Sequence, residues 1–330
     1  MQPSTAPALR CNYLLENRPF FTQVYHSWLD KFRPHSLEYL LKTRLNVVQY
    51  TLPILHNRID LDSLYPWDQL SSQSQLSCRL VQRPYPNSSN PRVSSASVEG
   101  LSTLFQEHTN HAFSCDIKDV DGLSSSKSPL HDFASMEQFA LACCAKEIGP
   151  GTPEQFSVAI AHKGIRHIHN SGFKQLYCFY RHAWDERLFM PNEDGSHHFA
   201  AAQHLARKFG IDYELQAPLR TVRLNVSALN DLERRFHMYV ISDDALGAMR
   251  SALTVGYGVE YYEQSLPLPR LSEFSGQNIV KPIAILIPSS SKKADAVARL
   301  LQEHGITNLA SVLSEMFFKQ HQLDDRGHPA

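Results

Sequence analysis

The chain has 330 residues, of which 42% are hydrophobic and 20% are charged, and its formal net charge is -1. These values are ordinary for a globular protein and exclude a uniformly basic nucleic-acid-binding protein. The first ten residues lack the basic start and apolar run of a signal peptide, and no apolar run is long enough to cross a bilayer. We therefore expect a cytoplasmic protein with no membrane partner. The six cysteines include no C-x-x-C pair, which predicts reduced thiols.

The first 98 residues are predicted to be helical and then polar. Apolar spacing predicts helices over residues 20–32 and 36–45, with Pro34 between them. Residues 71–97 are rich in Ser, Gln, Asn and Pro, which is typical of a linker or surface loop. We therefore divide the chain into a helical N-terminal region with a polar linker, residues 1–98, and a mixed α/β domain, residues 99–330.

The remainder of the chain alternates between helical and strand-like patterns. Glycines that follow helical spacing mark where three of the predicted helices end. Short β-branched or aromatic runs predict strands between these helices. The predicted helices cover 136–148, 199–209 and 292–304, and the predicted strands cover 156–161, 176–180, 221–224, 237–241 and 282–288. This order predicts a mixed α/β (α+β) fold.

Residues 192–202, with the sequence NEDGSHHFAAA, form the most informative stretch. Asp194-Gly195 signals a turn, because glycine adopts backbone angles that other residues avoid. Ser196 is predicted to cap the helix that follows. Free backbone N–H groups at the start of a helix attract anions, and phosphate most of all. The stretch therefore predicts an anion site next to the adjacent His197 and His198.

This block resembles the D-G-H-R-R-x-x-A-A motif of the ParB/sulfiredoxin-like fold. In that fold, a strand, the Asp-Gly turn, a helix and a further strand cradle the phosphate of a nucleotide. The resemblance covers the motif and extends over about residues 176–225, and it implies a ParB/sulfiredoxin-like central core that binds a nucleotide. The family's phosphate-binding arginine aligns with His198. The block is also similar to a D-G-S-H-H-F stretch of a bacterial family seen around mobile elements.

Our first hypothesis is a protein that binds a phosphorylated small molecule, in particular a nucleotide, at this turn. Asp194, Gly195 and Ser196 would form the ligand-binding turn. His197 or His198 would carry a proton in a hydrolytic or phosphotransfer reaction, because imidazole titrates near neutral pH. Arg166 and Arg181 would contact the phosphate. Whether the protein is an enzyme stays open, as does a requirement for a divalent metal.

Two other hypotheses belong to different classes. His167 and His169 would lie on one side of a strand, and with His162 or His197 they would supply ligands for zinc or iron. The protein would then be a histidine-ligated metalloenzyme. Alternatively, it is a non-catalytic interaction protein of a mobile element whose pocket takes a protein or a nucleic acid.

The sequence also supports three expectations about geometry. Gly195 should adopt a backbone conformation that disfavours a Cβ atom, directly before a helix. His198 should lie nearer a cavity than Cys143 or Cys144, which occupy an apolar helix and are expected in the core. The backbone amides at the helix start should be free and should converge with an arginine on one point.

Overall fold

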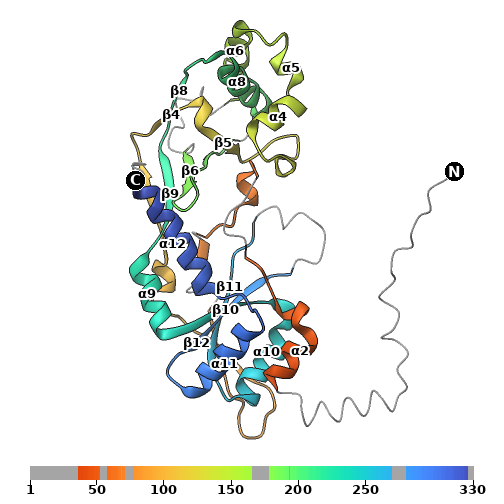
Figure 1. Cartoon of the computed structure of the whole chain (residues 1–330), viewed down its shortest axis with the longest axis vertical. Helices are drawn as coiled ribbons and strands as arrows, with labels where there is room; N and C mark the ends of the chain where they lie inside the picture. The colour runs from red at the N-terminus through yellow and green to blue at the C-terminus, as the bar shows by residue number, and fades with distance from the viewer. Residues whose placement is uncertain are drawn as a thin grey trace, which may run out of the picture.

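The computed structural model describes residues 36–52, 58–67, 69–70, 78–165, 178–192, 194–269 and 280–325. The predicted helix over 20–32 lies outside these residues, as do Arg166, His167 and His169. The described chain is mixed α/β, as predicted, and it is elongated, with one five-stranded sheet towards each end (Figure 1). None of its helices combines the length and the apolar content that crossing a membrane requires.

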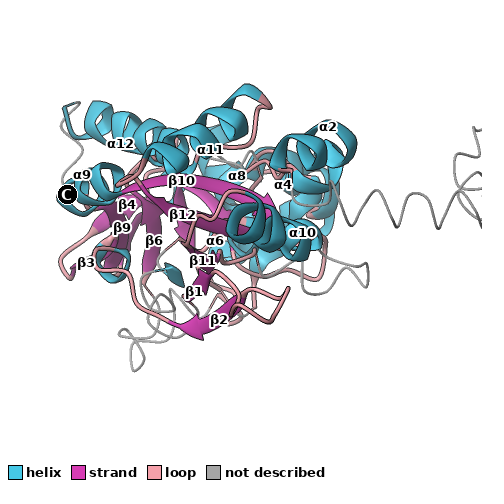
Figure 2. Ribbon diagram, turned by 90° about the horizontal axis from the view of Figure 1, so that it is seen from below, coloured by secondary structure: helices cyan, strands magenta, loops and turns pink. Residues whose placement is uncertain are grey.

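The first sheet is antiparallel throughout and has the order β10-β12-β11-β1-β2. Its interior strand β12 is buried on both faces, because Ile283, Ile285 and Ile287 enter one core while Ala284 and Leu286 enter another. Figure 2 shows α2 and α11 beside β10 and the strands running in order to the edge at β2. The elements are β1 (Arg79–Gln82), β2 (Arg92–Ser95), β10 (Phe236–Ser242), β11 (Tyr261–Ser265), β12 (Pro282–Pro288), α2 (Leu37–Val48), α10 (Leu246–Ser251) and α11 (Lys292–Glu303).

The predicted linker over residues 71–97 is wrong for its described part, which starts at residue 78. That part contains β1 and β2, and β1 pairs directly with β11. The proposed boundary at residue 98 therefore cuts through a sheet. The sequence does not predict these strands because they lie at the edge of the sheet. Val81 of β1 is fully buried, but the residues of β2 are mostly exposed and mostly polar.

The second sheet is mixed and has the order β3-β9-β6-β7-β5. In it β6 runs parallel to β9, and β5 runs parallel to β7. A separate two-stranded ribbon joins β4 and β8. The elements of this half are β3 (Phe105–Asn110), β4 (Ser114–Asp116), β5 (Val120–Leu123), β6 (Phe179–His182), β7 (Leu188–Met190), β8 (Glu214–Gln216), β9 (Leu219–Leu224), α4 (Met136–Cys143), α5 (Ala145–Ile148), α6 (Pro153–Ile160) and α8 (Ser196–Phe209).

In this half the predicted strand over 156–161 is wrong, and the predicted helix over 136–148 is two helices. The predicted strand over 156–161 lies mostly in helix α6, whose first residue is Pro153 and whose buried residues Phe156, Ala159 and Ile160 follow helical spacing. The predicted helix over 136–148 is divided into α4 and α5 at Cys144, which leaves helical geometry with φ -114° and ψ 24°.

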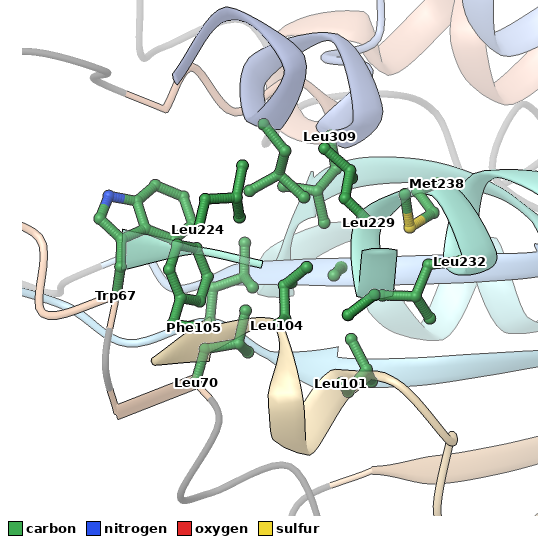
Figure 3. Packing of buried hydrophobic residues seen from close by; sticks show 14 of the residues in the cluster. Trp67, Leu70, Leu101, Leu104, Phe105, Leu224, Leu229, Leu232, Met238 and Leu309 are labelled. Atoms are coloured by element: carbon green, nitrogen blue, oxygen red, sulfur yellow. The ribbon is translucent and has the colours of Figure 1, made fainter. Parts of the chain in front are cut away.

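A hydrophobic cluster lies between the two sheets (Figure 3). It brings together Trp67 and Phe105 with residues of α9 (Val226–Arg235) and α12 (Leu309–Asp325). Helix α12 runs along this junction in Figure 1, next to both β9 and β10. Short 3-10 turns and one π turn complete the described chain: η1 (Leu61–Ser63), η2 (Leu101–Thr103), η3 (Ile117–Asp119), η4 (Leu130–Asp132), η6 (Asp243–Ala245) and η7 (Ala252–Gly256).

Candidate functional site

Gly195 connects the end of β7 to helix α8 and has the left-handed conformation, with φ 74° and ψ 10°. The prediction that it disfavours a Cβ atom directly before a helix is confirmed. A Cβ atom here would lie 2.6 Å from the carbonyl carbon and oxygen of Gly164 and from the nitrogen of Ile165. Gly195 is therefore required twice, for its backbone angles and for the close approach of the segment after α6.

The turn before α8 is held to the end of β5 by Asn192, a residue for which the sequence predicts no role. Its Oδ1 atom accepts hydrogen bonds of 3.1 Å from the backbone amides of both Ser124 and Ser125. Its Nδ2 atom donates to the carbonyl of Ser125 at 2.9 Å. Because β5 and β7 are parallel, their carboxyl ends lie side by side, and Asn192 joins them.

The first turn of α8 has no side-chain cap. The first backbone hydrogen bond of this turn runs from the amide of Phe199 to the carbonyl of Gly195, at 2.9 Å. No acceptor in the described part of the chain contacts the amides of Ser196, His197 or His198. The carboxylate of Asp194 accepts from the amide of Gly195 at 2.7 Å and, among the described residues, from none of these three amides. The expected free amides are therefore present.

The predicted capping role of Ser196 is wrong. Ser196 is the first helical residue and is buried, and its hydroxyl lies 3.0 Å from that of Ser126. Gly195 occupies the cap position instead, where it has no side chain to offer to the amides. The helix start is left open to a ligand for this reason.

A cavity of about 690 Å³ lies at this helix start. Four segments form its walls: the loop after β5, the junction of α4 and α5, His162 after α6, and the turn into α8. Its lining includes two lysines, three histidines and two carboxylates. The lining residues are Ser125, Ser126, Lys127, Cys143, Lys146, Glu147, His162, Asp194, Gly195, Ser196, His197 and His198.

The side chains of His198 and His162 are in direct contact in the lining of this cavity. Their rings are stacked with centroids 3.6 Å apart and an interplanar angle of 6°. The Nδ1 atom of His162 accepts a hydrogen bond of 3.1 Å from the amide of Gly164. Partial burial and the charge of His162 lower the pKa of His198, while the carboxylates of Glu147 and Asp194 act in the opposite direction. His198 is therefore biased towards its neutral form.

His197 has a different role from its neighbour. Its Nε2 atom lies 3.0 Å from the hydroxyl of Ser128, and its Nδ1 atom lies 3.4 Å from that of Ser196. Its ring packs on Phe139, with centroids 5.3 Å apart. Both ring nitrogens thus have hydroxyl neighbours, which hold the ring in place. Of the two adjacent histidines, His198 is the better suited to exchange a proton with a ligand.

Arg181 is not brought to this cavity. It lies in β6 with its guanidinium 5.9 Å from the centroid of the Phe113 ring, and burial lowers its pKa. Its buried Nε atom has no hydrogen-bond partner among the described residues. The prediction that Arg181 contacts the phosphate is wrong. It was based on nearness in sequence to the histidines, whereas β6 runs away from the start of α8. Lys127 and Lys146 line the cavity instead, and no sequence pattern distinguished them from other surface lysines.

The two adjacent cysteines lie in different surroundings. Cys144 is fully buried, as predicted, and burial raises the pKa of its thiol to about 12. Cys143 is half-buried and lines the cavity, so the prediction of a core position is wrong for this residue. Helical geometry explains the difference, since consecutive residues point in different directions. The expected contrast with His198 therefore holds for Cys144 alone.

The metal hypothesis rested on His167 and His169, which lie outside the described residues. Within the described ranges, no group of three or more His, Cys, Asp or Glu residues is arranged to hold a metal ion.

Comparison with known protein families gives a match. Residues 110–324 match a family of unknown function (DUF6685), and this region includes every residue that lines the cavity. No curated protein and no solved structure matches the chain.

Proposed function

The chain belongs to DUF6685, and we propose that it binds a phosphorylated ligand, in particular a nucleotide, in the cavity at the start of α8. His198 would carry a proton in a hydrolytic or phosphotransfer reaction on that ligand. The observation that carries the proposal is the uncapped start of a 14-residue helix opening into a cavity lined by Lys127 and Lys146. Amides, helix dipole and lysines all favour an anion there.

The size and charge of the cavity agree with such a ligand. Its volume lies within the range of about 300–1,000 Å³ that small-molecule sites occupy. Lys127 and Lys146 balance the carboxylates of Glu147 and Asp194, so the attraction for phosphate depends on the helix start and on the protonation of the histidines. A ligand of this size with a negatively charged group directed at the amides of α8 would fit both the volume and the charge of the cavity.

The local chain order supports the finer proposal of a ParB/sulfiredoxin-like core. Strand β7, the glycine turn and helix α8 follow one another, and β9 comes next after the short strand β8, an order similar to that of the phosphate-binding block of that fold. His198 would occupy the place of the arginine that binds phosphate there. An imidazole is a weaker anion ligand than a guanidinium, so phosphate binding would depend chiefly on the free amides at the start of α8.

Binding can be tested by calorimetry and thermal shift with ATP, CTP, AMP and inorganic phosphate, each with and without magnesium. We expect at least one nucleotide to bind, and Lys146→Gln or His198→Ala to weaken it by about tenfold, the loss of one charge-assisted hydrogen bond. Lys319→Gln is the matched control, since Lys319 lies on α12, outside the cavity lining, and loses the same charge.

Release of inorganic phosphate from the bound nucleotide then tests the reaction. His198→Ala should abolish release even at saturating nucleotide, whereas Lys319→Gln should retain it. If folded wild-type protein binds neither phosphate nor any nucleotide at millimolar concentration, the proposal fails. The cavity would then be better explained as a surface for a protein or nucleic-acid partner.

A further inference from the structure

A second cavity, of about 280 Å³, lies at the edge of the second sheet where β5 and β7 end. Ser124 after β5 and Pro191 after β7 line it, whereas their neighbours Ser125 and Asp194 line the cavity at the start of α8. Among the described residues, none lines both cavities. The amide of Asn192 donates to the hydroxyl of Ser124 at 2.7 Å and helps to fix the junction that contributes to both. The second cavity is therefore a separate site.

Part of its wall is apolar and is held in place by hydrogen bonds. The hydroxyl of Tyr65 lies 3.0 Å from that of Tyr50, and the hydroxyl of Tyr180 lies 3.0 Å from Nε2 of the buried His182. Because each hydroxyl has a partner, both tyrosines offer mainly ring surface to a ligand. The small volume favours a ligand that is smaller than a nucleotide and has one bulky apolar group. The apolar lining residues are Leu61, Leu64, Tyr65, Pro66, Tyr180 and Pro191.

The described lining also contains one cationic and one anionic side chain. Arg220 of β9 pairs in register with Tyr180 of β6, so the two side chains lie on the same face of the sheet. The Nε atom of Arg220 is 3.4 Å from the carboxylate of Glu107, but this ion pair is exposed, and the guanidinium has further N–H groups for a ligand. Asp62 of η1 supplies the carboxylate. The two charges cancel, which favours a ligand that carries both signs of charge over a phosphate.

We propose that the second cavity binds a free amino acid with a large apolar side chain. The carboxylate of the ligand pairs with Arg220, its ammonium group pairs with Asp62, and its side chain packs against the rings of Tyr65 and Tyr180. The site does not depend on the proposed binding of a phosphorylated ligand, because the two cavities have separate linings.

Calorimetry with a set of related small molecules tests the three contacts. Phenylalanine and leucine should bind at millimolar concentration or below. Alanine lacks the bulky side chain, 3-phenylpropionate lacks the ammonium group and phenethylamine lacks the carboxylate. Each of these three should bind at least about tenfold more weakly than phenylalanine, because each has lost one contact. If the folded protein binds neither phenylalanine nor leucine, or binds the three truncated compounds equally well, the proposal is overturned.

Variants of the two charged residues test the same assignment from the side of the protein. Arg220→Gln and Asp62→Asn should each weaken phenylalanine by about tenfold. Arg223→Gln is the matched control, because Arg223 lies on the same strand, pairs in register with Gln106 and is outside the described lining. It should leave the affinity unchanged. With circular dichroism showing all the proteins folded, an affinity in Arg220→Gln equal to that of the wild type would overturn the proposal.

Two half-buried cysteines report which cavity is occupied. Cys178 lines the second cavity and Cys143 lines the cavity at the start of α8. Alkylation by iodoacetamide can be followed at each cysteine by mass spectrometry. Phenylalanine should slow the reaction of Cys178 and leave that of Cys143 unchanged, and a nucleotide should do the reverse. Slowing at Cys143 alone by phenylalanine would overturn the site assignment, whereas a nucleotide that neither binds nor protects Cys143 would count against the proposed function only.

Discussion

Replacing Gly195 by alanine should destabilise the protein by two separable effects. The left-handed backbone at φ 74° costs a residue with a Cβ atom about 1–2 kcal/mol. The new methyl group would also meet three backbone atoms of Gly164 and Ile165 at 2.6 Å, which the segment can relieve only by moving. Such overpacking typically costs about 1–3 kcal/mol. We therefore expect Gly195→Ala to lower the free energy of unfolding by about 3 kcal/mol.

Gly210 at the other end of the same helix provides the control. Its φ is 64°, but a Cβ atom there would have no heavy atom within 4 Å, so Gly210→Ala should cost only about 1–2 kcal/mol. Both changes introduce the same residue, and their effects on the unfolded chain cancel in the comparison. Urea unfolding followed by circular dichroism gives both values. Equal losses for the two variants would refute the close contact between Gly195 and the segment after α6.

Two further predictions concern buried charges away from the cavity. Asp60 is almost fully buried, and burial raises its pKa from 3.8 to about 6. Because the folded state binds the proton more tightly, the free energy of unfolding should fall by about 3 kcal/mol as the pH rises from about 4 to above 6. Asp60→Asn should remove that decline, and parallel pH profiles of the two proteins in urea unfolding would contradict it. Glu263 is also buried, and accepts hydrogen bonds of 2.8 and 2.6 Å from Arg250. Arg250→Met should therefore cost about 3–5 kcal/mol by leaving that buried carboxylate without a cationic partner, and the double variant with Glu263→Gln should recover much of the loss. A double variant no more stable than the single one would rule out this explanation.

Much of the local structure could be predicted because its signals lie close together in the sequence. The start of α2 follows Ser36, whose hydroxyl accepts from the amide of Tyr39. Helix α8 ends at Gly210, which has the left-handed conformation expected there. Strand β12 was predicted with its exact bounds, because it is apolar on both faces and ends at proline. In each case a few neighbouring residues define the element.

The cavity could be predicted only along the part of its wall that is continuous in sequence. Gly195 and His198 were identified because the turn and the helix start lie in one stretch. Lys127, Lys146 and His162 come from three other segments, which the packing of α4, α5 and α6 on α8 and the bonds of Asn192 to the end of β5 bring together. Nothing within those segments marks the residues as partners. Arg181 was wrongly included for the converse reason, since it is near in sequence and distant in the fold.

Different parts of helix α8 contribute to the hydrophobic core of this half and to the wall of the cavity. Its residues from Phe199 onward supply the core, and the side-chain Nε2 atom of Gln203 donates to the carbonyls of Ile117 and Val120 at 2.8 and 2.6 Å. These contacts fix the helix whether or not its first turn is occupied. The first turn can therefore keep its amides unpaired. The free energy lost by leaving those amides without acceptors is small compared with the stabilisation from the apolar surface that the rest of the helix buries. A rigid helix with an open start is well suited to hold an anion without rearranging.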